Sequence, residues 1–243
     1  MFRFFLFLFF TISFCNHLNS QSTELQLLNK SFQLQNDSLL HLFFENWQRE
    51  TLIENVPKEP ILADLDILFQ GIYEPENLNK ISGLTTWDSV YAGIPYYIVQ
   101  NDIKIGIVKS DSLQKTGKYY DSTMLVMDID EFRPQLQFKN TKTLYLTDKY
   151  SKILTSFFED SAAANASSQK SKLKFLGKYV KIVPDTAQNW FFETRPIVQA
   201  AYFNRTQKIA RIDFCLFSQG GSAYFVKENE QWRMIWSGIT WRE

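Results

Sequence analysis

The stretch Lys208–Glu243, KIARIDFCLFSQGGSAYFVKENEQWRMIWSGITWRE, decides the fold that the sequence predicts. It contains three runs rich in β-branched and aromatic residues, separated by Gly220-Gly221 and by Asn229-Glu230. Runs of this composition are typical of strands. Glycine and asparagine tolerate the positive φ angles of two-residue hairpin turns. We therefore predict a meander of three antiparallel strands that turns at these two pairs of residues.

The predicted registers define two faces, because side chains alternate across a strand. Turns at these positions put Phe217 opposite Tyr224 and Phe225 opposite Met234. One face is apolar and is expected to be core: Ile212, Phe214, Leu216, Ala223, Phe225, Trp232, Met234 and Trp236. The second face is mixed: Asp213, Cys215, Phe217, Tyr224, Val226, Arg233 and Ile235. A mixed face indicates cover by a further layer, a partner or a ligand.

The composition is that of an ordinary globular protein. The 243 residues include 26 basic and 26 acidic side chains, so the formal net charge is zero, and 45% are hydrophobic. Because nucleic-acid-binding proteins carry a basic excess, we expect no nucleic-acid partner.

Residues 1–20 have the order of a secretory signal peptide. Arg3 is a short positive segment, Phe4–Phe14 is an apolar segment too short to span a bilayer, and Leu18-Asn19-Ser20 is a candidate cleavage site. The alternative is a lipid anchor at Cys15, although the residue before it is bulky. We expect an exported protein that is periplasmic, on the surface of a Gram-negative cell, or secreted.

Four segments place apolar residues at the spacing of an amphipathic helix. They are a helix from Asn36 or Asp37 to near Thr51–Asn55, Ile61–Tyr73, Lys149–Glu159 capped by Asp148, and Lys172–Val183. In the second helix, Asp64 and Asp66 are expected at a solvated edge.

Shorter β-rich runs supply the remaining strands. Tyr96–Val99 and Ile103–Val108 are predicted to form a hairpin, and further strands are expected at Thr123–Ile129, Thr143–Leu146, Trp190–Thr194 and Ile197–Phe203.

A change of composition suggests a domain boundary. Ser161–Ser171, SAAANASSQKS, is small, polar and of low complexity, so we predict a linker or mobile loop there. It separates a helix-plus-strand region, residues 21–160, from a helix-plus-sheet region, residues 172–243. A single domain made of both is the alternative. Gln21–Gln35 is expected to be a loosely docked lead-in.

Several chemistries lack the residues that they need. Without residues 1–20, the chain keeps one histidine, His41, and one cysteine, Cys215. Ser-His-Asp and Cys-His catalysis would need His41 beside a nucleophile, and no Gly-x-Ser-x-Gly motif is present. No cluster of His and Cys indicates a metal, and no Gly-rich phosphate loop is found. We expect no metal and no cofactor.

Carboxylate chemistry stays open. Asp128 and Asp130 share a strand face, near enough to perturb each other's pKa or to bind a hard cation. A solvated turn is the alternative. Asp213 beside Arg211 or Arg233 is a second candidate, for which an ordinary cross-strand ion pair is the alternative.

The mixed face of the meander is the predicted binding surface. The candidate ligand-binding residues are Asp213, Phe217, Tyr224, Arg233 and Trp190. Trp87, Trp190 and Trp241 lie in or near predicted loops, and flat indole rings stack on sugars. A carbohydrate-binding module is therefore an alternative.

Several segments resemble a family of exported Bacteroidota proteins to which no activity is assigned. They are Phe43-Phe44-Glu45-Asn46-Trp47, Trp190 through Arg195-Pro196, Gly220 to Phe225, and Thr240-Trp241-Arg242-Glu243. Members of the family often carry His and Gly just before the position of Trp190, where this chain has Asp185 to Asn189. The resemblance implies an exported location and the integrity of the fold, and it assigns no activity.

These observations predict an α+β fold in which amphipathic helices pack on an antiparallel sheet that ends in a meander. Its outline is similar to cystatin-like and NTF2-like folds, by analogy of architecture alone. The expected function is non-enzymatic binding of a partner protein or a small ligand. A carboxylate-dependent glycan hydrolase, with two acids flanking a cleft, is the alternative from another class.

Overall fold

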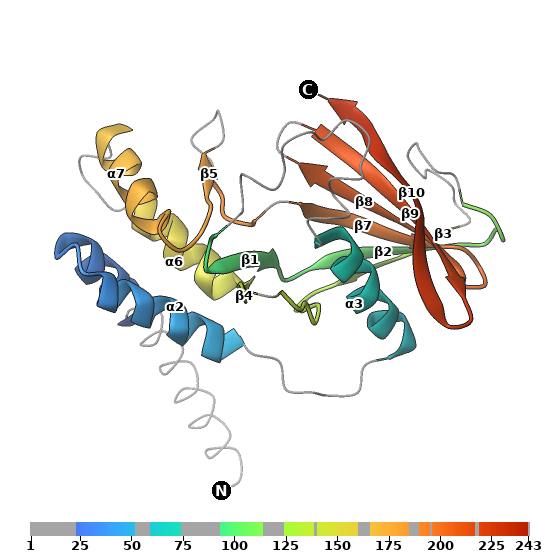
Figure 1. Ribbon diagram of the computed structural model, residues 1–243, viewed down its shortest axis with the longest axis horizontal. Helices are drawn as coiled ribbons and strands as arrows, with labels where there is room; N and C mark the ends of the chain where they lie inside the picture. The colour runs from blue at the N-terminus through green and yellow to red at the C-terminus, as the bar shows by residue number, and fades with distance from the viewer. Residues whose placement is uncertain are drawn as a thin grey trace, which may run out of the picture. The chain divides into compact units, whose positions relative to one another are not determined.

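The computed structural model describes residues 23–51, 59–73, 93–113, 124–138, 140–159, 166–184, 190–194, 196–216 and 219–242. Residues 23–33 are helical. The elements that follow are α2 (Asp37–Thr51), α3 (Pro60–Tyr73), β1 (Tyr96–Gln100), β2 (Ile103–Val108), β3 (Met124–Ile129), β4 (Lys142–Leu146), α6 (Asp148–Glu159), α7 (Ala166–Leu176), β5 (Val183–Pro184), β6 (Trp190–Phe191), β7 (Ile197–Phe203), β8 (Ile209–Leu216), β9 (Gln219–Glu228) and β10 (Gln231–Arg242) (Figure 1).

The fold is α+β with a C-terminal meander, as the sequence predicts. Within the part of the chain that the structure describes, no helix is both long enough and apolar enough to cross a bilayer. The predicted signal peptide and the candidate lipid site Cys15 lie outside the described residues.

The chain forms two compact units, each built from two separate stretches. Unit 1 comprises Met1–Leu52 and Leu146–Phe192, and unit 2 comprises Ile53–Tyr145 and Glu193–Glu243. The predicted linker does not separate these units, because α6 and α7 on its two sides both belong to unit 1. Its residues 166–171 are the first part of α7.

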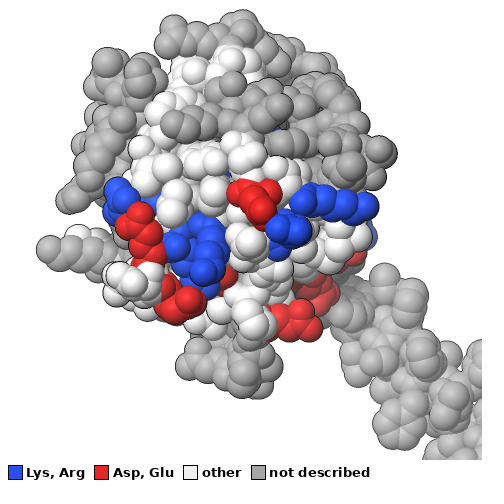
Figure 2. Space-filling model, turned by 90° about the vertical axis from the view of Figure 1, so that its right-hand side faces the viewer, with Lys and Arg blue, Asp and Glu red and all other residues white. Residues whose placement is uncertain are grey.

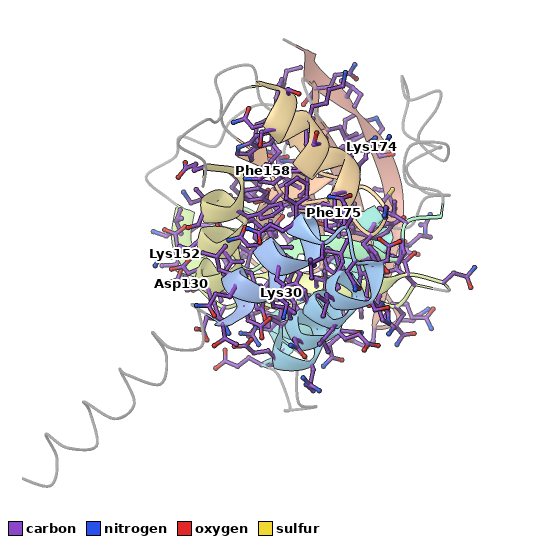
Figure 3. All side chains as sticks on the ribbon, turned by 90° about the vertical axis from the view of Figure 1, so that its left-hand side faces the viewer. Lys30, Asp130, Lys152, Phe158, Lys174 and Phe175 are labelled. Atoms are coloured by element: carbon purple, nitrogen blue, oxygen red, sulfur yellow. The ribbon has the colours of Figure 1, made fainter. Side chains whose placement is uncertain are left out.

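Unit 1 is held together by aromatic side chains from its helices. The ring of Trp47 in α2 stacks on that of Tyr150 in α6, with centroids 4.4 Å apart and planes at 5°. Phe32 meets Phe157 and Phe175 edge-on at 5.7 and 5.5 Å. Figure 3 labels two buried aromatic residues, Phe158 and Phe175, and three exposed lysines, Lys30, Lys152 and Lys174.

A buried lysine caps a helix of unit 1. Lys172 in α7 donates from Nζ to the carbonyl oxygen of Phe157 at 2.5 Å. Phe157 lies near the end of α6, where carbonyl groups lack intrahelical partners and the helix dipole favours a cation. Since α6 has no basic residue in its own last turn, α7 supplies the charge.

Local signals predicted most helix boundaries correctly. Asn36 caps α2, because its Oδ1 accepts from the backbone N–H of Leu39 at 3.0 Å. The predictions for α3 and α6 are confirmed within one residue. The prediction of a loosely docked lead-in at Gln21–Gln35 is wrong, because residues 23–33 form a helix in which Leu28 and Ser31 are buried. The last predicted helix starts earlier than expected and ends before Gly177.

Unit 2 is a six-stranded sheet with the order β10-β9-β8-β7-β2-β3, covered on one face by α3 (Figure 1). The core between them includes Leu65, Leu68, Phe69 and Ile72 of α3 and Phe203, Ile212, Phe214 and Phe225 of the sheet. Each of these side chains contributes roughly 1.5–3 kcal/mol by burial. A charged contact joins helix and sheet, because Lys227 Nζ lies 3.0 Å from Oδ1 of Asp64. The prediction of a solvated Asp64 is wrong, because this carboxylate is buried.

The second turn of the meander is confirmed. Asn229 and Glu230 have φ angles of 51° and 60°, and Phe225 pairs with Met234. A register shift between Met234 and Trp236 then places Trp236 opposite Tyr224. The prediction that Trp236 lies on the core face is therefore wrong, and its side chain packs with Tyr224 on the second face.

The first predicted turn is wrong. Gly220 and Gly221 lie inside β9, where they pair with Cys215 and Phe214, and Leu216 pairs with Gln219. Neither glycine has a positive φ angle. The two glycines supply space instead of turn geometry: a Cβ on Gly221 would lie 2.5 Å from Cζ of Phe214 and 2.6 Å from the carbonyl oxygen of Gly238.

The predicted hairpin of β1 and β2 is also wrong. Both strands exist, but β1 pairs with β4, whereas β2 pairs antiparallel with β3 and parallel with β7. β7 pairs antiparallel with β8 through the turn after Asn204.

The two glycines of β9 should differ in their response to alanine. At Gly221 the clash involves backbone, so G221A should lower the free energy of unfolding by about 1–3 kcal/mol. At Gly220 the three atoms nearest to an added Cβ all belong to the indole of Trp241, an exposed side chain that can rotate away, so G220A should cost less than about 1 kcal/mol. Urea denaturation measures both. Equal losses would contradict this account of the glycines.

Candidate functional site

The second face of the sheet of unit 2 carries a row of charged and small residues. The registers align Asp128 of β3, Lys104 of β2, Ala200 of β7, Asp213 of β8 and Ser222 of β9. Neighbouring strands are about 4.8 Å apart, so Lys104 and Asp213 lie about two strand spacings from each other. The row therefore holds two separate charged groups with Ala200 between them.

The first group is a buried ion pair. Arg211 is 1% exposed, and its Nη2 lies 2.8 Å from Oδ2 of Asp213, whose side chain is 23% exposed. Ser222 Oγ donates to the other carboxylate oxygen at 2.7 Å. The guanidinium also lies 4.8 Å from the ring centroid of Tyr202. Both carboxylate oxygens of Asp213 accept hydrogen bonds from the protein, so we interpret the Arg211–Asp213 pair as structural.

Burial around this pair affects a neighbouring phenol. The pKa of Tyr202 is raised, chiefly by desolvation and further by the negative charge of Asp213, while Arg211 opposes the shift. Tyr202 therefore stays neutral and protonated at physiological pH.

The second group borders a pocket of about 620 Å³ in unit 2. Its lining comes from the end of β1, the start of β2, the end of β3 and the start of β7: Gln100, Asp102, Ile103, Lys104, Asp128, Ile129, Asp130, Glu193, Ile197, Val198 and Gln199. Four of these side chains are carboxylates and one is basic. The pocket is thus acidic, with apolar walls from three isoleucines and a valine.

The only basic residue of the lining is partly neutralised. Lys104 Nζ lies 3.7 Å from Oδ1 of Asp128, and both side chains are largely exposed, Asp128 at 72%. Exposed pairs of this kind contribute little to stability. Three further carboxylates, of Asp102, Asp130 and Glu193, also line the pocket.

A side-chain amide fixes the pocket wall at β7. Gln100 is buried, accepts from the backbone N–H of Val198 at 2.7 Å and donates to its carbonyl at 2.6 Å. The same Nε2 donates to the carbonyl of Asp102 at 2.8 Å. Gln100 thus takes the place of a strand neighbour for Val198. A register shift follows at once, between Val198 and Ala200, so Gln199 is the extra residue of β7.

The predicted ligand-binding residues do not come together. Tyr224 is buried, and its hydroxyl donates to the carbonyl of Leu113 at 3.0 Å. Arg233 is exposed and lies 3.2 Å from Glu228. Trp190 belongs to unit 1, where its ring stacks on Phe158 at 4.1 Å. Asp213 is held in the buried ion pair described above.

Two of the predicted positions lie outside the described residues, Phe217 and Trp87. Of the remaining tryptophans proposed for sugars, Trp241 lies over Gly220 on the second face and is exposed. The three candidate acids divide: Asp128 and Asp130 line the same pocket, and Asp213 is absent from its lining.

Sequence reasoning missed the other half of the pocket. Asp102 follows a strand in a predicted turn, and Glu193 lies in a predicted strand some 60 residues after Asp130. Only the parallel pairing of β2 with β7 brings the residues near Glu193 beside β2. No local spacing predicts such a pairing.

A cluster in unit 1 was also missed. Glu50 accepts from Lys149 at 2.5 Å and from the hydroxyl of Tyr150 at 2.6 Å. Burial raises the pKa of Glu24, with the positive charge of Lys149 opposing the shift and Glu50 adding to it. The pKa of Tyr150 is also raised, chiefly by burial and then by its bond to Glu50. The cluster joins residues 23–33, α2 and α6.

Charges of both signs lie together on one side of the molecule. On the side of the molecule seen in Figure 2, basic and acidic side chains lie interleaved. The turns of unit 2 carry such pairs, for example Arg205 with Asp111 at 2.9 Å and Lys227 with Glu230 at 3.3 Å. The acidic pocket differs from this pattern.

Among the described residues, no group of three or more His, Cys, Asp or Glu side chains is arranged to hold a metal ion. Comparisons with known proteins add no assignment: no family model, no curated protein and no solved structure matches the chain. The resemblance to an exported Bacteroidota family, and the analogy with cystatin-like and NTF2-like outlines, therefore stay predictions.

The bridge from Gln100 to Val198 should stabilise unit 2. In Q100L, a buried N–H and a buried C=O of Val198 lose their partners, so the free energy of unfolding should fall by about 3 kcal/mol. Gln70 makes the same two-bond bridge to Gln137, at 3.0 and 2.8 Å, on the exposed surface. Water can replace that bridge, so Q70L is the matched control and should cost under about 1 kcal/mol. Similar losses in the two variants would show that burial does not matter.

Glu24 should make stability fall as pH rises. Burial raises its folded pKa above the ordinary value of a glutamate. Its contribution is therefore fully present below the unfolded pKa and is lost as pH rises through the folded value. E24Q should raise the melting temperature at pH 8 by a few degrees and change it little at pH 4. E45Q alters an exposed carboxylate of α2 and should have a smaller effect at pH 8. A lower melting temperature of E24Q at pH 8 would contradict the assignment.

Proposed function

We propose that this chain is an exported, non-enzymatic binding protein whose pocket in unit 2 takes a small organic cation. The observation that carries the proposal is the lining of the pocket, which has four carboxylates against a single lysine. The described residues on the side of the molecule seen in Figure 2 mix both signs of charge. A concave site lined by one sign of charge concentrates counter-ions of the opposite sign.

The size and the walls of the pocket define the ligand class. A volume of about 620 Å³ falls in the range of small-molecule sites, roughly 300–1,000 Å³. Ile103, Ile129 and Ile197 offer apolar contact, whereas Gln199 and the carboxylates offer hydrogen-bond acceptors. This lining suits a primary amine or guanidinium group attached to an aliphatic body.

The fixed wall of the pocket supports binding without large rearrangement. Gln100 is already fully engaged with Val198 and Asp102, so the strand ends that present Ile197 and Gln199 are held in place. A site formed before binding avoids part of the cost of ordering its side chains.

Carboxylate-dependent hydrolysis is the second candidate, because Asp128 and Asp130 line one pocket. It is less well supported than binding. A glycosidase needs one carboxylic acid kept protonated by dry surroundings, and both of these carboxylates are exposed to solvent. Export rests on the character of residues 1–20.

Calorimetric titration with agmatine and with spermidine tests the proposal. Both should bind, and glutamate should not. Each charge-assisted hydrogen bond is worth about 1.5–3 kcal/mol, so D130N combined with E193Q should weaken binding at least about tenfold. E228Q removes an exposed carboxylate of unit 2 outside the pocket and should leave affinity unchanged. Equal affinity for all three proteins, or no binding of either amine, would overturn the proposal.

A further inference from the structure

The six-stranded sheet has two edges, and they differ in how they are protected. β10 is twelve residues long, and its register with β9 shifts twice, between Met234 and Trp236 and between Ile239 and Trp241. Such bulges bend an edge and discourage pairing with another chain. β3 pairs with β2 without any shift, from Ile103 opposite Ile129 to Val108 opposite Met124. Only the β3 edge is regular.

The regular edge is also apolar and accessible. Leu125 is 57% exposed and Val126 is 45% exposed, and these neighbours point to opposite faces of the sheet. In the described part of the chain, no strand pairs with the outer side of β3. Every second residue of such a strand directs its N–H and C=O outward, which makes the edge a template for a further strand.

Charge is distributed unevenly along this edge. Asp128, Asp130 and Glu131 lie at the carboxyl end of β3, and all three are exposed. At the other end, Val108 pairs with Met124 and is followed by exposed Lys109. The β3 edge is therefore acidic at one end and apolar in the middle, and Lys109 follows β2 near its other end.

We infer that β3 accepts an extended segment of another polypeptide, whose basic end lies against Asp128 and Asp130. The segment adds a seventh strand and pairs its backbone with the outer edge of β3. Its apolar side chains pack beside Leu125 on one face and Val126 on the other. A lysine or arginine opposite the end of β3 has its Cβ about 5 Å from that of its neighbour, within reach of both carboxylates.

A basic segment fits this edge better than a second copy of the chain does. Antiparallel pairing of two β3 strands would bring Lys109 of one copy toward the acidic end of the other. Asp128 already has Lys104 at 3.7 Å, so Asp130 and Glu131 would share this one lysine and part of the negative charge would stay uncompensated. A six-residue edge is also short for a stable dimer, since specific interfaces bury about 1,200–2,000 Å². Recognition of a short extended peptide needs no more than the pairing of one strand.

This inference goes beyond the proposed function, because the occupant is a polypeptide and the edge is a different surface. The pocket and the β3 edge share Asp128 and Asp130, so the experiment must distinguish binding at the edge from binding in the pocket. Leu125 is absent from the pocket lining. Changing it alters the edge and leaves the proposed binding of small amines intact.

Fluorescence anisotropy with the full chain tests the inference. The probes are fluorescein-labelled peptides of alternating valine and threonine, with two lysines at the amino end for antiparallel pairing or at the carboxyl end for parallel pairing. One of the two should bind. Methylation of alternate backbone nitrogens in that peptide removes hydrogen bonds to the edge, and it should weaken binding about tenfold or more.

Variants and controls decide among the outcomes. L125K should weaken peptide binding about tenfold, because a charged side chain replaces the apolar one beside which the segment packs, and it should still bind agmatine like the unaltered chain. I67K makes the same change at an exposed position of α3 and should leave peptide binding unchanged. If neither peptide binds, if the methylated peptide binds equally well, or if L125K has no effect, the inference fails. A stable dimer in sedimentation that L125K dissociates would also overturn it, because a second copy would then occupy the edge.

Discussion

The contact of Phe214 with the backbone of Gly221 is the constraint on which the packing of unit 2 depends. The two residues pair directly across β8 and β9, and the ring fills the space that any side chain at position 221 would need. Because the ring lies against the neighbouring strand, Phe214 and Phe225 fit together under α3. The residues of β9 around Gly221 are also small, and they read Gly-Gly-Ser-Ala from Gly220 to Ala223.

The same small residues shape the second face. Gly220 leaves room for the indole of Trp241, and Ser222 is short enough to donate to Asp213. Arg211 is buried beside them and is neutralised by that carboxylate. Removing two charges from water costs several kcal/mol per ion, and the serine hydroxyl and the ring of Tyr202 offset part of this cost. Asp213, which we predicted from the sequence to bind a ligand, therefore has a structural role in the ion pair with Arg211.

What could be predicted from the sequence depended on whether the signal was local. Asn36 caps α2 and Asn229 turns the chain, because each acts on residues within a few positions. The role of Gly220-Gly221 could not be predicted from the sequence, because glycine occurs both in turns and where strands pack closely. The contact with Phe214, which distinguishes these two roles, is seen only in the structure. The prediction that Trp236 lies on the core face failed because the sequence did not reveal the bulge before it. A bulge of one residue moves the side chains that follow it to the other face.

The pocket and the open edge both follow from the pairing of β2. A hairpin with β1 would have kept β2 among its sequence neighbours, but β2 lies between β3 and β7, and its pairing with β7 is parallel. Parallel strands need a long connection, and here that connection runs through α6 and α7 of unit 1 before it returns at Glu193. The returning strand brings Ile197 and Gln199 to the start of β2, where they form the pocket with the end of β3. On its other side β2 holds β3, which has no further partner in the described sheet. The acids at the end of β3 therefore serve two surfaces at once, a concave one toward β7 and an edge facing outward.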